Sequence, residues 1–129
     1  MIITLREHLE TTLSLPVHWV AINERDNFPC CTLRKSLLDT HHGLKKANGW
    51  AVTGVELTVY ALDYEKLESI SREVVAKYDG KLEALTEGRN KLKIYIDDED
   101  DDAYPAPDGS DDWIYAREIS IRVHHKIEG

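Results

Sequence analysis

The stretch from Gly54 to Gly80, GVELTVYALDYEKLESISREVVAKYDG, determines the predicted fold. Apolar and polar residues alternate from Gly54 to Leu62, which predicts a β-strand with one buried face. Asp63 follows and is suited to an N-cap, because its carboxylate can accept a hydrogen bond from the first helical turn. Apolar residues then recur at helical spacing, at Tyr64, Leu67, Ile70, Val74 and Tyr78. Asp79-Gly80 predicts the helix end, since glycine readily takes the left-handed conformation that follows many helices.

Similar patterns on either side of this unit predict the remaining elements. Residues 2–13 have helical spacing and end before Pro16, and residues 17–22 and 28–38 are typical of two strands joined by a turn. Residues 92–96 and 113–125 alternate in polarity and predict two further strands. The expected order is α-β-β-β-α-β-β, an α+β fold with two helices on an antiparallel sheet of about four to five strands. We expect residues 1–129 to form a single domain.

The negative charge of the chain is concentrated in one segment. The 129 residues contain 24 acids and 16 Lys or Arg, for a net charge of -8. Residues 97–112, DDEDDDAYPAPDGSDD, hold nine of the acids and no base, so the rest of the chain has 15 acids against 16 bases. This distribution excludes a generally basic nucleic-acid binder and a generally acidic disordered chain. We expect residues 97–112 to form an acidic loop and residues 39–50 to form a hairpin arm around Asn48-Gly49.

Composition also indicates the setting of the protein. No apolar run reaches the roughly 18 residues that a transmembrane helix needs, and the N-terminal residues are too charged for a signal peptide. Cys30 and Cys31 are adjacent, so a disulfide between them would close a strained ring. We expect reduced thiols in a cytoplasmic setting, one on each face of a strand.

The acidic segment is the main candidate for chemistry. Asp98, Asp100 and Asp102 alternate as in a calcium loop, but the EF-hand pattern would need Gly and Glu where Ala103 and Gly109 stand. A solvated loop is therefore the favoured interpretation. Weak divalent-ion binding, a metal-dependent hydrolase and an acidic surface for a basic partner are alternatives. The sequence has no nucleophile motif, phosphate loop or dinucleotide fingerprint, so we assign no catalytic, cofactor or metal residues and expect no enzyme.

The candidate interface residues come from the two predicted excursions. They are Lys45, Lys46 and Trp50 in and beside the arm, and Asp98, Asp100 and Asp102 in the acidic segment. Two lysines supply little of the multiple phosphate contact that DNA binding requires, so we expect no specific nucleic-acid binding. We expect Trp19 and Trp113 to be core or core-edge residues, and Trp50 to pack under the arm or serve as an interface anchor.

The layout resembles the tail completion (tail terminator) proteins of long-tailed bacteriophages. The resemblance is carried by residues 59–64 (VYALDY), by Asp79-Gly80 at the helix end, and by the final strand from Trp113 to His125. It implies a non-enzymatic ring, commonly a hexamer, that caps the tail tube at the head-proximal end of the virion tail and offers a head-tail joining surface. Implied partners are other copies of the chain, the tail tube protein and a head-completion or connector protein, with assembly in the host cytoplasm and no membrane. The alternative is a small adaptor module whose acidic loop binds a basic protein.

Overall fold

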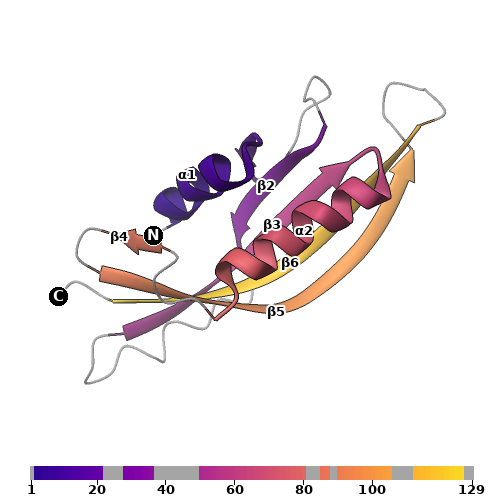
Figure 1. The fold of residues 1–129 in the computed structure, drawn as a ribbon. Helices are drawn as coiled ribbons and strands as arrows, with labels where there is room; N and C mark the ends of the chain where they lie inside the picture. The colour runs from indigo at the N-terminus through magenta and orange to yellow at the C-terminus, as the bar shows by residue number, and fades with distance from the viewer. Residues whose placement is uncertain are drawn as a thin grey trace.

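The computed structural model describes residues 2–21, 28–36, 50–80, 85–87, 90–105 and 112–126. These form two helices and one six-stranded sheet in the order β1-β2-β3-β6-β5-β4 (Figure 1). The elements are α1 (Ile2–Leu13), β1 (Val17–Trp19), β2 (Cys30–Lys35), β3 (Trp50–Ala61), α2 (Tyr64–Tyr78), β4 (Leu85–Glu87), β5 (Asn90–Pro105) and β6 (Trp113–Lys126).

The α+β class and the order α-β-β-β-α-β-β predicted from the sequence are confirmed. The structure adds the three-residue strand β4 between α2 and β5. It also shows that β1 and β2 pair in parallel, whereas the other neighbouring strands pair antiparallel. The predicted strand at residues 28–38 is shorter, and the strand expected at 54–62 begins earlier, at Trp50.

The core lies between the sheet and the two helices, which both lie on one side of it (Figure 1). Each helix contributes one buried stripe, because its apolar residues recur every three or four positions. The stripe of α1 is Leu5, Leu9 and Leu13, and that of α2 includes Leu67, Ile70, Val74 and Tyr78. The two helices are linked by a hydrogen bond of 2.6 Å between His8 Nδ1 and the Tyr78 hydroxyl. We call the other side of the sheet the open face.

The predicted boundaries of α2 are confirmed. Asp63 caps its start by accepting a hydrogen bond of 2.9 Å from the backbone N–H of Glu65. Beyond its end, Gly80 takes a left-handed φ of 70° and donates its N–H to the carbonyl of Ile94 at 2.7 Å. The Asp79 carboxylate accepts the N–H of Ile96 at 2.9 Å. The end of α2 is therefore attached directly to β5.

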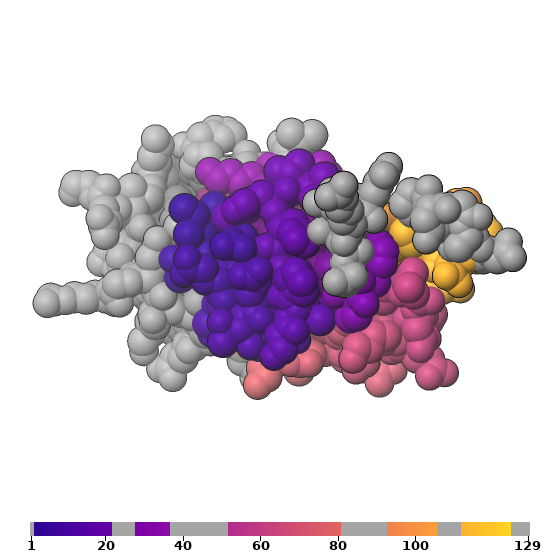
Figure 2. Space-filling model, turned by 90° about the horizontal axis from the view of Figure 1, so that it is seen from above, coloured from indigo at the N-terminus to yellow at the C-terminus, as the bar shows by residue number. Residues whose placement is uncertain are grey.

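Two expectations about burial need correction. Cys30 and Cys31 point to opposite faces of β2 as predicted, but both are fully buried, and burial raises the pKa of Cys31 to about 12. Trp19 and Trp113 are not core residues, since 43% and 51% of their surfaces are exposed. Trp19 lies on a short edge strand, and Trp113 starts β6 beyond the helical cover. Figure 2 shows β6 (yellow) emerging at one end, past the indigo and pink helical segments.

Candidate interaction surface on the β5–β6 hairpin

Most of the predicted acidic loop is a strand, which corrects the sequence prediction. Residues 97–105 continue β5 and pair with β6, from Asp98 opposite Ser120 to Pro105 opposite Trp113. Residues 106–111 lie outside the described part of the chain. The consecutive acids form a strand because β6 offers a long antiparallel partner and several of them find donors. The acidic residues are thus held in fixed positions on a hairpin.

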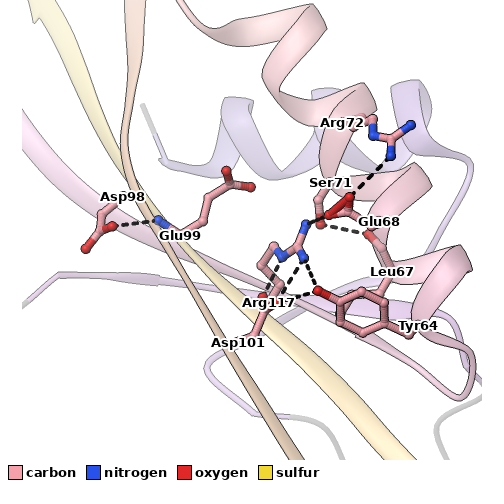
Figure 3. A network of polar contacts seen from close by, with 9 residues as sticks. All are labelled: Tyr64, Leu67, Glu68, Ser71, Arg72, Asp98, Glu99, Asp101 and Arg117. Carbon is pink, nitrogen blue, oxygen red and sulfur yellow. Dashed lines mark hydrogen bonds and ion pairs between the residues drawn. The ribbon is translucent and has the colours of Figure 1, made fainter.

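A β-bulge at Asp97 decides which way these acids face. The register passes from Ile96 opposite Ile121 to Asp98 opposite Ser120, so Asp97 is the extra residue. A bulge of one residue exchanges the two faces of the strand that follows it. Ile94 and Ile96 face the helices before the bulge, and Glu99 and Asp101 face the helices after it. Asp98, Asp100 and Asp102 therefore lie on the open face, and Figure 3 shows Asp98 pointing away from α2.

A cluster around Arg117 attaches the hairpin to α2 (Figure 3). We call Tyr64, Glu68, Asp101 and Arg117 the Arg117 cluster. The Arg117 guanidinium donates to both Asp101 oxygens, at 2.5 and 3.0 Å, and to the Tyr64 hydroxyl at 3.0 Å. It also forms an ion pair with Glu68, and Tyr64 donates to Asp101 at 2.9 Å. Only 9% of the Arg117 side chain is exposed, so its charge needs these partners.

The contacts of the Arg117 cluster shift the pKa values of its members in consistent directions. The hydrogen bond to Asp101 raises the pKa of Arg117, and the hydrogen bonds from Arg117 lower the pKa values of Asp101 and Glu68. The hydrogen bond to Asp101 raises the pKa of Tyr64. The arginine and both carboxylates are therefore charged and Tyr64 is neutral at neutral pH, which keeps the hairpin fixed against α2.

Other acids of the run also have partners in the structure. Arg122 forms an ion pair with Asp97, with N–O distances of 2.7 and 2.8 Å. Asp98 and Asp102 each accept the backbone N–H of the next residue, at 3.0 and 2.8 Å. The outer edge of β5 has no neighbouring strand beyond Leu92 among the described residues. These carboxylates therefore satisfy N–H groups that would otherwise be open to another strand.

Four acids of β5 and β6 form an exposed acidic surface on the open face. Asp98, Asp100, Asp102 and Glu118 are all exposed, and Asp100 stands directly opposite Glu118. Asp100, Asp102 and Glu118 border a shallow trough of about 290 Å³, whose lining also includes Tyr60, Tyr104 and Arg34. Arg34 already forms an ion pair with Glu56 at 2.6 Å. Unlike charges directly opposite one another on a sheet attract and like charges repel, so this surface favours a cationic partner.

The structure brings only part of the predicted interface together. Asp98, Asp100 and Asp102 share one face, whereas Lys45 and Lys46 lie outside the described residues. Trp50 is the first residue of β3, and its side chain also lies outside the described part. Within that part, no three His, Cys, Asp or Glu side chains are placed to hold one metal ion, and no helix is long and apolar enough to cross a membrane.

Sequence reasoning missed the Arg117 cluster. The signal was present in the last strand, because Arg117 occupies a position in the alternation that otherwise places Ile119, Ile121 and Val123 in the core. A charged residue in a buried stripe indicates a buried ionic contact. Its partners Asp101 and Glu68 lie 16 and 49 residues away in the sequence. A local sequence pattern therefore does not identify them.

The comparisons with known proteins bear on the fold. No protein-family model matches this chain, and no curated protein matches it. Among solved structures, it is similar to a chain from a structure described as the virion of a native gene transfer agent (GTA) particle. The two chains share 16% sequence identity with a TM-score of 0.51, and the match covers 94% of this chain and 84% of that one. At this identity the similarity shows that the two chains share a fold.

Proposed function

We propose that this chain is a structural protein of a phage-like virion, a tail terminator that forms a ring on the tail tube. The carrying observation is the fold similarity to a chain of a gene transfer agent virion over 94% of the length. The sequence resemblance to tail completion proteins points to the same class of particle and supplies the finer assignment. The ring, expected to be a hexamer, would cap the tube at its head-proximal end and provide the head-tail joining surface.

The contacts that join the elements of the structure support a role in assembly rather than in catalysis. The Arg117 cluster, the Asp97–Arg122 ion pair and the attachment of Gly80 to Ile94 all join elements to one another. A hairpin fixed in this way can present the same surface in every copy, and assembly at a constant angle requires that uniformity. The proposed partners are other copies of this chain, the tail tube protein and a head-completion or connector protein.

Measurements of the mass and shape of the assembled particle test this proposal. The purified chain is measured by light scattering over a series of concentrations and viewed by negative-stain electron microscopy, alone and with tail tubes of the same particle. The expected result is a closed ring with a mass near six times 14.8 kDa, located at one end of the tubes. A chain that remains monomeric at every concentration and leaves the tube ends bare would refute the proposal.

A second candidate function is an adaptor that binds a basic protein. The specific observation in its favour is the exposed acidic surface of Asp98, Asp100, Asp102 and Glu118. Because these residues belong to strands, deletion would remove part of the sheet, and substitution is the sharper test. Replacing the three aspartates with asparagine should abolish binding of a basic partner in the adaptor case, whatever the oligomeric state. Unchanged binding would remove this candidate.

A further inference from the structure

The charges of β5 and β6 are segregated along the length of these two strands. One end of β5 and β6, residues 90–96 and 121–126, carries Lys91, Lys93, Arg122 and Lys126 and no acid. The other end, residues 97–105 and 112–120, carries eight acids, and its one base is the buried Arg117. We call these the basic end and the hairpin end. They correspond to opposite ends of the elongated sheet in Figure 1.

The two ends are far enough apart to act separately. The pair Lys93–His124 marks the basic end and the pair Asp100–Glu118 marks the hairpin end, six residues away along β6. At about 3.3 Å per residue this is roughly 20 Å, which exceeds the screening length of about 8 Å at physiological ionic strength. A partner that contacts β5 and β6 at one end therefore meets an excess of one sign of charge.

The hairpin end also exposes apolar side chains that can anchor a contact. Trp113, at the start of β6, and Leu62, just after β3, are both about half exposed. The last pair between β3 and β6 joins Ala61 to Tyr115, so both residues lie near the same end of the sheet. Tryptophan is enriched at interface hot spots because it buries a large area with little loss of rotamer freedom. An apolar anchor with acidic residues around it is suited to a basic protein surface.

We propose that the hairpin end of one subunit binds the basic end of the next, so that the occupant of this surface is a second copy of the chain. This inference rests on the proposed ring-forming function and names its subunit interface. Contacts between like ends would bring charges of one sign together and are repulsive. Contacts between unlike ends are heterologous, and heterologous contacts close into a ring when the rotation between subunits permits it.

Charge reversal at each end tests the contact directly. The first variant carries Asp100→Lys and Glu118→Lys, which reverses two of the eight acids of the hairpin end. These two residues face each other across the hairpin, so the substitution keeps a like-charge pair and adds no new kind of strain. The second variant carries Lys93→Glu and Lys126→Glu, which reverses two of the four bases of the basic end. Each variant alone should stay near the monomer mass of 14.8 kDa at concentrations where the wild type forms rings.

Mixing the two variants gives the decisive measurement. In an alternating ring of the two variants, every contact joins either two unaltered ends or two reversed ends, so an equimolar mixture should recover the wild-type mass. Assembly of the wild type should also shift to at least tenfold higher concentration when salt is raised from about 0.1 to about 1 M, since the screening length falls to about 3 Å. The control variant, Glu7→Lys with Glu73→Lys on the exposed helix surfaces, changes the net charge by the same four units and should assemble normally.

The outcomes separate this inference from the proposed function. If the wild type forms no ring, the proposed function fails and the interface fails with it. If the wild type forms rings and each reversed variant does too, the ring stands and this interface is wrong. If both variants stay monomeric and their mixture also does, the charges do not pair with each other and the inference is overturned. Loss of tube binding with intact rings would assign the acidic surface to another partner and overturn it as well.

Discussion

Replacing Arg117 with methionine should destabilise the protein and release the hairpin from α2. The substitution keeps most of the side-chain volume but leaves the carboxylates of Asp101 and Glu68 without their shared cation. Removing one partner of a fully buried ion pair costs about 3–5 kcal/mol. The side chains of Asp101 and Glu68 are 41% and 33% exposed, so water can solvate them again and reduce this cost. We expect the free energy of unfolding to fall by about 2 kcal/mol, or the melting temperature by about 8 °C.

The matched control for Arg117 is Arg72, which pairs with the same Glu68 at 3.4 Å. The Arg72 side chain is 79% exposed, so Arg72→Met removes the same kind of group from a solvated ion pair and should cost less than about 0.5 kcal/mol. Urea unfolding followed by circular dichroism measures both variants. A double-mutant cycle of Arg117→Met with Asp101→Asn should give a coupling energy of about 1–2 kcal/mol.

The effect of Arg117 should also depend on pH, with a defined sign. Arg117 holds the pKa of Asp101 below its usual range, so the folded state is stabilised above the ordinary pKa of about 4. This stabilisation is lost as the pH falls through the lowered pKa. The stability difference between wild type and Arg117→Met should therefore be complete at neutral pH and shrink in acid below about pH 4. Equal stability of the Arg117 and Arg72 variants at neutral pH, or a coupling energy of zero, would refute the reasoning.

Three further predictions concern the core and the end of α2. Tyr78→Phe removes the hydrogen bond to His8 and should lower the free energy of unfolding by about 1 kcal/mol in urea, whereas no change would mean that the bond contributes nothing. Gly80→Ala meets no atom within 4 Å but must keep a φ of 70°, so a loss of about 1 kcal/mol is expected and an unchanged melting temperature would contradict it. Cys30 and Cys31 are fully buried, so an aromatic disulfide reagent at about pH 8 should label neither until the protein is unfolded, and rapid labelling of the native protein would disprove this.

The sequence predicted the unit from Gly54 to Gly80 because every signal in it is local. The alternation of β3, the Asp63 cap and the left-handed Gly80 each depend on neighbours within a few residues. The sequence did not show that Trp113 is exposed, because its exposure depends on where α2 begins relative to the hairpin. Tertiary packing sets the position of α2 relative to the hairpin, and the local sequence around Trp113 does not encode it.

The acidic segment was misjudged for a related reason. A run of aspartates has low strand propensity, and its local chemistry favours a solvated loop. Strand formation depends on Arg117 and Arg122, which lie 16 and 25 residues further along the chain from their aspartate partners. The alternation of Asp98, Asp100 and Asp102 was visible in the sequence. It resembled a calcium loop, but it is the period of two that a strand imposes.

The acids of β5 also line its outer edge, which has no partner strand beyond Leu92 in the part of the chain that the structure describes. An open edge offers its N–H and C=O groups to any other strand, and the far edge strand β1 of a second copy is one available partner. On β5 the N–H groups of Glu99 and Ala103 are already bonded to the preceding aspartates. The acidic side chains would also repel another acidic edge. A ring that assembles through the ends of the sheet requires that the β5 edge does not pair with other strands, because such pairing would compete with closure of the ring. The same short run can therefore lock the hairpin to α2, block the edge and give the sheet its acidic end.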